Sequence, residues 1–211
     1  MAFPIVTVEG NIGSGKTSLS KKLAKDMGAT LVLETFADNP FLQKFFEKQQ
    51  DYALGTEMFF MAERYEQIKD AVPDWEQLEQ PVVVDYLFTK SLLYASTNLD
   101  ADEYALFEKI FGILNPKLPH SDLIVYLHSG LDRLIANIFQ RGREFEQTVR
   151  RDYLQQIEDR YMAYFATYDA CPILVLDVSN ADFVQKEKHY LQIKALIEKP
   201  HSKGVHHYTI E

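Results

Sequence analysis

Short runs of β-branched and apolar residues alternate along the chain with longer stretches in which apolar residues recur every three or four positions. The short runs predict five buried strands, at Phe3–Val8, Thr30–Leu33, Gln80–Asp85, Leu123–Leu127 and Ile173–Leu176. The longer stretches predict helices over Ser14–Met27, Asn39–Gln50, Tyr52–Ala71, Leu87–Thr97, Ala101–Leu114, Leu131–Gln140, Val149–Tyr168 and Ala181–Ile197. Short buried strands separated by long helices indicate an α/β fold in which helices flank a five-stranded parallel sheet.

The chain offers no clear place for a domain boundary. It contains no internal repeat and no linker rich in Gly, Ser or Pro, and a length of 211 residues suits one domain. We therefore expect one domain over residues 1–198. The polar, histidine-bearing segment 199–211 predicts a flexible C-terminal tail. Its adjacent His206 and His207 lack a carboxylate partner, which fits a solvated terminus better than a metal site.

Composition narrows the classes of protein. Hydrophobic residues make up 46% and charged residues 25% of the chain, as in a folded globular protein. A net charge of −9 without a cationic run argues against nucleic acid as a partner. The single Cys171 excludes an internal disulfide. No apolar stretch approaches the ~18 residues of a membrane span, and the N-terminus leads directly into an expected strand. We expect no signal peptide, no membrane partner and a cytoplasmic location.

A phosphate-binding motif lies between the first expected strand and the first expected helix. The pattern G-x-x-x-x-G-K-[ST] is matched by Gly10, Asn11, Ile12, Gly13, Ser14, Gly15, Lys16 and Thr17. Glycines let backbone N–H groups surround a phosphate, Lys16 reaches the outer phosphates, and the Thr17 hydroxyl is offered to Mg²⁺. The motif in this context predicts a P-loop NTPase fold that binds ATP and Mg²⁺.

Charged residues follow two of the expected strands and one expected helix. Glu34 and Asp85 end strands at the carboxyl edge of the sheet, where α/β proteins bind ligands, and Asp85 is placed to help hold Mg²⁺. Either acid has a helix N-cap as its alternative. Arg141-Gly142-Arg143 suits a lid that closes over a triphosphate, because guanidinium groups bind phosphate oxygens bidentately. The alternative for this segment is an ordinary solvated helix junction.

Missing sequence features help to decide which class of nucleotide-binding protein this chain is. We find no Asn-Lys-x-Asp element of the kind that reads guanine in switch GTPases, and the chain is short for a motor ATPase. A kinase for a small acceptor needs a carboxylate near the acceptor hydroxyl and a mobile basic lid that excludes water. Both features are present, so the sequence favours a small-molecule kinase.

Two segments resemble the deoxyribonucleoside kinases, especially the bacterial deoxyadenosine and deoxyguanosine kinases. Glu9–Thr17 is similar to that family's phosphate loop. Asp132-Arg133-Leu134, followed by Arg141-Gly142-Arg143, Glu146 and Tyr153-Leu154, is similar to its lid and the helix after it. The likeness extends from about Phe3 to Ile197. It implies ATP-dependent and Mg²⁺-dependent phosphorylation of a deoxyribonucleoside on its 5′-hydroxyl, in nucleotide salvage, by a homodimer.

The resemblance also implies roles for particular residues. It implies catalytic roles for Glu34, Lys16, Arg141 and Arg143, metal contacts by Thr17 and Asp85, and substrate contacts by Glu34, Phe46, Tyr52, Glu57, Arg64, Asp85, Tyr94 and Glu146. Glu34 would take the proton of the 5′-hydroxyl, Arg64 would lie beside the base, and Glu146 would contact the sugar. The two tyrosines would stack on the base, and Phe46 replaces a tyrosine that contacts the sugar.

Several positions depart from the family pattern. The family has Arg-Ser after the third-strand acid, whereas Asp85 is followed by Tyr86-Leu87, so we expect the cation near the acceptor to be missing. Glu57 stands in place of a glutamine that bonds to the base. If the segment after Asp85 is one residue shorter than in the family, Tyr94 matches the base-stacking aromatic and Lys90 stands in place of an acid. Glu57 and Lys90 are either a pair across the pocket or surface charges. The departures leave open which base is preferred. They also leave open two alternative functions, a nucleoside monophosphate kinase and a non-catalytic nucleotide-binding regulatory protein.

Overall fold

The protein is an α/β structure built on one parallel sheet. The computed structural model describes residues 3–35, 39–71, 74–75, 77–143 and 146–211. In these residues six parallel strands follow the order β2-β3-β1-β4-β5-β6. The strands are β1 (Ile5–Gly10), β2 (Thr30–Val32), β3 (Val82–Val84), β4 (Leu123–His128), β5 (Pro172–Asp177) and β6 (Gly204–Thr209). The α/β class and the parallel sheet are as the sequence predicts, but the expected number of five strands is wrong.

The helices agree with the predicted stretches except at some ends. They are α1 (Lys16–Met27), α2 (Leu42–Glu47), α3 (Gln49–Ala71), α4 (Lys90–Asn98), α5 (Ala101–Leu114), α6 (Leu131–Arg141), α7 (Arg151–Thr167) and α8 (Glu187–Ile197), with a 3₁₀ turn at Asn115–Lys117. The last helix begins six residues later than predicted. The Asp182 carboxylate accepts a hydrogen bond from the backbone N–H of Gln185 at 2.9 Å. This local bond holds a turn where the apolar periodicity predicts helix.

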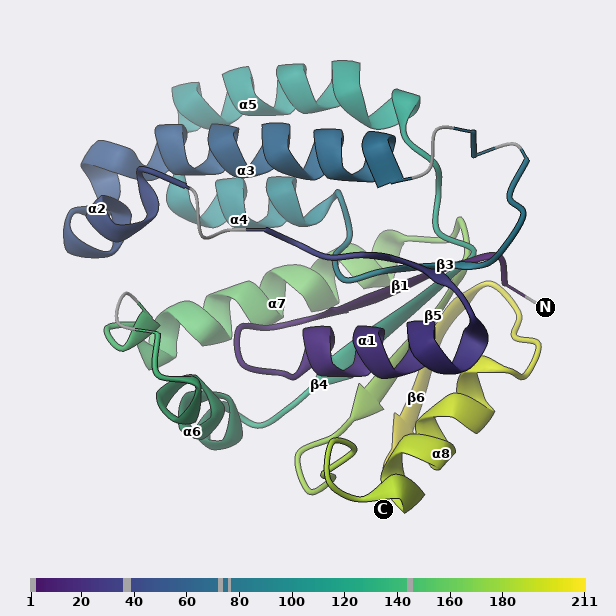
Figure 1. Cartoon of the computed structure of the whole chain (residues 1–211). Coiled ribbons are helices and arrows are strands. Elements are labelled where there is room, and N and C mark those ends of the chain that lie inside the picture. The colour runs from purple at the N-terminus through teal and green to yellow at the C-terminus, as the bar shows by residue number, and fades with distance from the viewer. Residues whose placement is uncertain (1–2, 36–38, 72–73, 76, 144–145) are drawn as a thin grey trace.

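Helices cover both faces of the sheet (Figure 1). Helices α1 and α8 pack on one face, and α3, α4, α5 and α7 pack on the other. The central strand β4 shows how one short run serves both layers. Leu123, Val125 and Leu127 belong to the core with α1 and α8, whereas Ile124 and Tyr126 belong to the core with α7. Since successive strand side chains point to opposite faces, a strand buried on both sides is apolar throughout.

The segment predicted as a flexible tail contains the sixth strand. Strand β6 pairs in parallel with β5, from Gly204 opposite Pro172 to Thr209 opposite Asp177. Ile210, directly after β6, is 1% exposed in the core shared with α1 and α8. The outer edge of β5 would otherwise present unpaired backbone groups, and β6 satisfies them. The tail prediction failed because polar and histidine residues on an edge strand carry little hydrophobic pattern.

The P-loop connects β1 to α1 at the carboxyl edge of the sheet, and two of its glycines are sterically required. Gly13 has φ +82°, and a Cβ there would lie 2.7 Å from the Leu134 carbonyl oxygen of α6. Gly15 has φ +92°, and a Cβ there would lie 2.8 Å from the Phe183 ring. Both positions combine a left-handed backbone with close packing, so a side chain at either one would open the loop.

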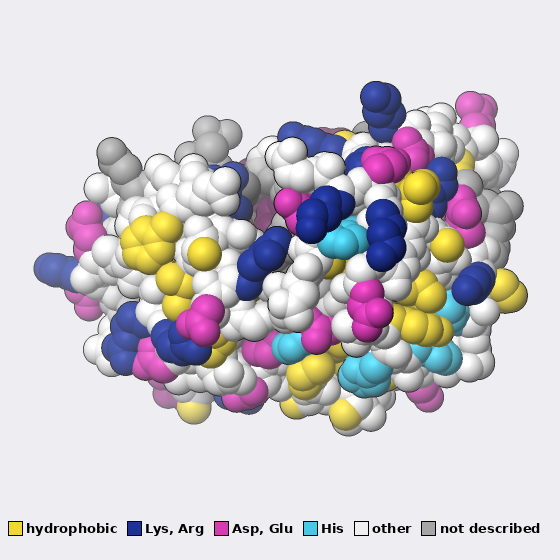
Figure 2. Space-filling model, turned by 90° about the horizontal axis from the view of Figure 1, so that it is seen from below, with side chains coloured by type: hydrophobic (Ala, Val, Ile, Leu, Met, Phe, Trp, Pro, Cys, Tyr) yellow, Lys and Arg dark blue, Asp and Glu magenta, His cyan; other side chains and the backbone are white. Residues whose placement is uncertain are grey.

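Surface features are consistent with the composition. Figure 2 shows positive, negative, histidine and apolar side chains interspersed on the side seen from below in Figure 1. Within the described ranges, no helix is both long enough and apolar enough to span a membrane.

The buried position of Ile210 tests whether the last strand belongs to the folded core. Ile210→Ala should lower the free energy of unfolding by about 2–4 kcal/mol, because it leaves a cavity beneath α8. Urea unfolding monitored by circular dichroism measures the change. Thr209→Ala, at the exposed neighbouring position, serves as the control and should lie within about 0.5 kcal/mol of the wild type. Equal stability of the two variants would show that Ile210 contributes nothing to the core.

Candidate active site

The phosphate loop is held in shape by its own lysine and by helix α6. Lys16 Nζ donates to the backbone oxygens of Gly10 at 2.8 Å and Asn11 at 3.1 Å. From α6, Asn137 Nδ2 donates to the oxygen of Gly13 at 2.8 Å. Burial lowers the pKa of Lys16, and the nearby cation of Lys90 lowers it further. A buried lysine beside a like charge is placed to bind an anion, which a phosphate would supply.

Hydroxyl and carboxylate oxygens of Thr17, Ser20 and Asp85 lie together beside the P-loop. Thr17 Oγ1 donates to Asp85 Oδ2 at 2.6 Å, and Ser20 Oγ donates to Oδ1 at 3.3 Å. Burial raises the pKa of Asp85 to about 6, against the opposing effect of Lys16. A bound cation would offset this desolvation, and hydroxyl and carboxylate oxygens are ligands that Mg²⁺ prefers. The described residues include no cluster of three or more His, Cys, Asp or Glu suited to a metal.

Two cavities meet at the phosphate loop. The first, which we call the acceptor cavity, extends from the P-loop toward α2, α3 and α4 and holds about 850 Å³ of space, including its opening to solvent. The second, which we call the donor groove, runs from the P-loop between α6 and the segment before α8 and holds about 1380 Å³, again including its opening to solvent. Both are lined by Gly13, Lys16, Thr17, Arg141 and Arg143. Molecules bound in the two cavities would therefore face one another across the phosphate loop.

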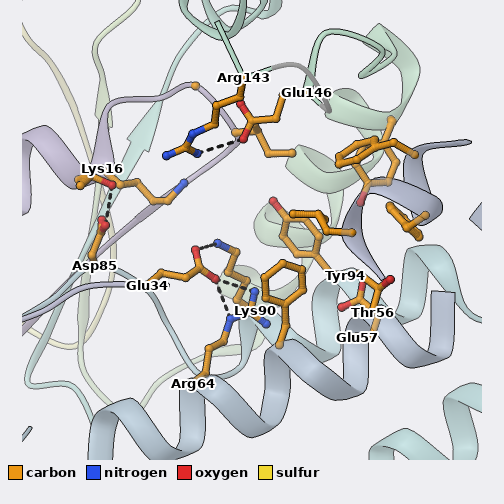
Figure 3. A pocket seen from close by; sticks show the side chains of 18 of the residues that line it. Lys16, Glu34, Thr56, Glu57, Arg64, Asp85, Lys90, Tyr94, Arg143 and Glu146 are labelled. Atoms are coloured by element: carbon orange, nitrogen blue, oxygen red, sulfur yellow. Dashed lines mark hydrogen bonds and ion pairs between the residues drawn. The ribbon is translucent and has the colours of Figure 1, made fainter. Parts of the chain in front are cut away.

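Glu34 lies in the acceptor cavity between two cations (Figure 3). Its Oε1 accepts from Arg64 Nε at 2.8 Å and is 2.7 Å from a terminal guanidinium nitrogen of the same arginine. Its Oε2 lies 2.8 Å from Lys90 Nζ. Burial alone would raise the pKa of Glu34, but Lys90 and Arg64 outweigh burial and hold the pKa well below its usual range. Glu34 is therefore ionised, and both of its oxygens are occupied.

The far end of the acceptor cavity is formed by a second carboxyl group among aromatic rings. Glu57 is 3% exposed, and Asn98 Nδ2 donates to its Oε1 at 2.7 Å. Its Oε2 and the hydroxyls of Thr56 and Tyr94 are buried without a hydrogen-bond partner among the described residues. Burial raises the pKa of Glu57 to about 7, although Arg64 favours the charged form. Buried polar groups are normally satisfied, so these atoms are suited to a polar ligand.

The arginine-bearing segment joins α6 to the residues before α7. The Glu146 carboxylate pairs with Arg141, and its Oε1 lies 3.1 Å from a terminal nitrogen of Arg143. All three residues line the acceptor cavity. Glu144 and Phe145, which belong to the predicted lid, lie outside the described residues. The segment therefore presents two guanidinium groups at the junction of the two cavities.

The structure brings most of the predicted site residues together. The acceptor cavity is lined by Lys16, Thr17, Glu34, Phe46, Glu57, Arg64, Asp85, Tyr94, Arg141, Arg143 and Glu146 among those that the sequence predicted. Tyr52 is not among the described residues that line it. Tyr52 lies one helical turn before Thr56, and Lys44 Nζ of α2 is 5.5 Å from its ring centroid. Contact of Tyr52 with a bound base thus has no support in the geometry.

The structure decides two points about cations. Lys90 pairs with Glu34, Glu57 is bonded by Asn98, and both residues are buried, so they are neither a pair across the pocket nor surface charges. The cation expected to be missing near the acceptor is present, because Lys90 and Arg64 both reach Glu34. Tyr86, at the position where the sequence departs from the family, is buried and donates to the Arg64 backbone oxygen at 3.0 Å. Sequence spacing cannot show which of two nearby carboxylates a lysine reaches.

A structural role for Glu9 was missed. Glu9 is fully buried, and its carboxylate accepts from the backbone N–H groups of Gly10 at 2.9 Å and Leu87 at 2.8 Å. It therefore ties the start of the P-loop to the segment that carries Asp85. An acid within an apolar strand, directly before the motif, was the signal. Asn98, which bonds to Glu57, carries no comparable signal in the sequence.

Transfer of a phosphoryl group between two bound molecules is the chemistry that two cavities joined at a P-loop serve, so the fold and the site define a P-loop kinase. The model of the deoxynucleoside kinase family matches residues 6–201. This chain therefore belongs to the deoxynucleoside kinase family.

Individual relatives agree with this assignment. A deoxyguanosine kinase of Bacillus subtilis is 32% identical over 200 residues, which cover 93% of this chain and 97% of that protein. A deoxyadenosine/deoxycytidine kinase of the same organism is 31% identical over 188 residues, 87% of this chain and 86% of that protein. The structure of a deoxyadenosine kinase from M. mycoides superimposes with a TM-score of 0.77 at 20% identity, over 92% of this chain and 98% of that chain. That likeness shows the fold.

Lys16→Ala tests whether the P-loop serves phosphoryl transfer. The variant should lose transfer almost completely while keeping its melting temperature, because the ammonium stabilises charge that develops on the phosphates in transit. A coupled assay of ADP release measures the rate, with Lys21→Ala at an exposed position of α1 as the control. Turnover within about 10-fold of the wild type would show that the lysine is not catalytic.

Proposed function

We propose that the protein transfers the γ-phosphoryl group of ATP to the 5′-hydroxyl of a purine deoxyribonucleoside, with deoxyguanosine as the first candidate. The observation that carries this proposal is the meeting of the acceptor cavity and the donor groove at Lys16 and the lid arginines, with Glu34 on the acceptor side. The donor groove would hold ATP with its triphosphate along the P-loop. The acceptor cavity would hold the nucleoside with its hydroxyl beside Glu34 and its base toward Glu57.

The reaction follows from this placement. The 5′-oxygen bonds to the γ-phosphorus, the bond from that phosphorus to the β–γ bridging oxygen breaks, and ADP leaves with the bond's electron pair. The hydroxyl proton passes to Glu34, whose carboxylate is ionised in the free protein. Because phosphoryl transfer has a loose transition state, the base acts late and positioning matters most. Lys16, Arg141 and Arg143 offset the charge on the phosphates.

We propose that Thr17 and Asp85 help to hold Mg²⁺, which would neutralise charge on the β- and γ-phosphates. Their adjacent oxygens support this assignment.

We also propose that the enzyme is cytoplasmic and acts as a homodimer. Leu106 and Ile113 of α5, which are 51% and 56% exposed, support an apolar face for a second copy.

Glu57 supports the choice of guanine. When Glu57 is ionised, its Oε2, which has no partner among the described residues, and the remaining lone pair of Oε1 can both accept hydrogen bonds. Guanine presents two matching donors on one edge, a ring N–H and an amine. Two relatives named deoxyguanosine kinase also support guanine. One is the Bacillus subtilis protein that is 32% identical, and the other is a Lactobacillus acidophilus protein that is 30% identical over 193 residues. Adenine presents an amine beside a ring nitrogen that only accepts, so it would need a protonated Glu57.

Glu34→Gln tests the assignment of the base. The variant keeps the shape and hydrogen-bonding capacity of the side chain but removes its basicity. We expect kcat to fall by about 10²–10⁴ with little change in nucleoside affinity. Steady-state kinetics and calorimetric binding of the nucleoside separate the two effects. A loss of affinity at unchanged kcat would instead make Glu34 a binding residue.

Glu57→Gln tests how the base is read. The amide always has both a donor and an acceptor, so the ratio of kcat/KM between deoxyguanosine and deoxyadenosine should shift toward deoxyadenosine. A mispaired buried polar group is worth about 1–3 kcal/mol, which sets the expected size. The pKa of Glu57 near 7 adds a dependence on pH. In the wild type the ratio should rise as pH increases through 7 and Glu57 ionises, whereas in the variant it should stay flat.

A ratio for two substrates of one enzyme cancels the titration of groups that serve both substrates equally. Glu66→Gln, at an exposed position of the same helix, is the matched control and should keep the wild-type dependence on pH. An unchanged order of preference among all four deoxynucleosides, with ratios constant within about twofold, would mean that Glu57 does not read the base.

A further inference from the structure

Lys90 occupies a position that is electrostatically unfavourable unless it is compensated. Lys90 is 5% exposed, and it is the first residue of α4. A cation at a helix N-terminus opposes the helix dipole, and a buried ammonium group costs free energy unless it is paired. A strong partner must therefore hold this lysine inside the cavity.

That partner is Glu34. Lys90 Nζ lies 2.8 Å from Oε2, and in the described part of the chain this is its one carboxylate within ion-pair distance. The other contact of the ammonium group is the face of Tyr94, with Nζ 5.4 Å from the ring centroid. Figure 3 shows Lys90 lying between the Glu34 carboxylate and the tyrosine ring. Among the described residues, the ion-pair contact of Lys90 therefore falls on a single oxygen.

Arg64 does not duplicate this contact. Both of its short contacts fall on Oε1 of Glu34, at 2.8 and 2.7 Å. Another guanidinium nitrogen of Arg64 donates to Ser91 Oγ at 3.0 Å, which anchors the arginine to α4. Arg64 thus fixes one carboxylate oxygen, and the direction of the second depends on Lys90. Without Lys90 the carboxylate would turn about the bond that leads to it, and Oε2 would have no partner.

We infer that Lys90 is a positioning residue for phosphoryl transfer, which acts by holding Oε2 of Glu34 where the acceptor hydroxyl meets it. The inference rests on the proposed role of Glu34 as the group that receives the hydroxyl proton. Lys90 supplies from α4 the cation that the Tyr86-Leu87 sequence lacks directly after Asp85. Small errors in the position of a catalytic group are costly, because the reacting atoms must lie in a narrow range of geometry.

A double-mutant cycle of Lys90→Met and Glu34→Gln tests this inference. Methionine keeps most of the length of the side chain and removes its charge. Lys90→Met should lower kcat by about 10- to 100-fold and change KM for ATP by less than about twofold. In the Glu34→Gln background the same substitution should lower kcat by less than about threefold, because the group that it positions is already gone. Lys90→Arg, which keeps the charge, should recover most of the lost kcat.

The controls separate positioning from a general disturbance of the fold. Lys109→Met, at an exposed position of α5, should leave kcat and KM unchanged. Lys90→Gln keeps a hydrogen-bond donor without the charge, so it carries the test if Lys90→Met unfolds.

Two outcomes would overturn the inference. Equal losses of kcat in both backgrounds would show that Lys90 acts on the phosphates independently of Glu34, and a wild-type kcat in Lys90→Met would show that it positions nothing. Failure of the Glu34 assignment is a different result, since Glu34→Gln alone would then keep its kcat.

Discussion

The carboxylate of Glu34 is the interaction on which the acceptor side of this enzyme depends. Glu34 lies two residues after β2. One of its carboxylate oxygens pairs with Arg64 of α3 and the other with Lys90 of α4. These two helices pack against one another on the same face of the sheet. The ion pairs therefore join the sheet edge to two helices, and they place two buried cations in the cavity that the phosphate loop also lines. Removing one member of such a group leaves another charge buried and unpaired, which is why networks of this kind are sensitive to substitution.

The pairing of Lys90 with Glu34 also explains the environment of Glu57, the second carboxyl group in the cavity. Because Lys90 contacts Glu34, the direct partner of Glu57 is the amide of Asn98 rather than a cation. Burial then raises the pKa of Glu57 to about 7, whereas the pKa of Glu34 falls. Two carboxyl groups in one cavity thus acquire different chemistry from their neighbours, one as a fixed anion and the other as a group that changes protonation near neutral pH.

The phosphate loop depends on supports that lie far from it in the sequence. Glu9 joins it to the segment after β3, Asn137 joins it to α6, and the Phe183 ring packs against Gly15. The loop is therefore held from the acceptor side, the lid side and the donor side. Substitutions at these supports would act on nucleotide binding through the shape of the loop.

The local pattern of this sequence determined five of the six described strands, most helix positions, the P-loop and the placement of Glu34 and Asp85 at the carboxyl edge of a parallel sheet. These features follow from short-range rules: hydrophobic period, glycine conformations and a helix that starts at the motif. Tertiary structure decided the sixth strand, because β6 is held by pairing with β5 rather than by its own composition. It also decided that Lys90 reaches Glu34 rather than Glu57, and that Tyr52 lies against α2. Which partners these side chains reach depends on how the helices pack. If α4 were displaced by one helical turn along α3, Lys90 would meet other residues, although the spacing of residues along the chain would be the same.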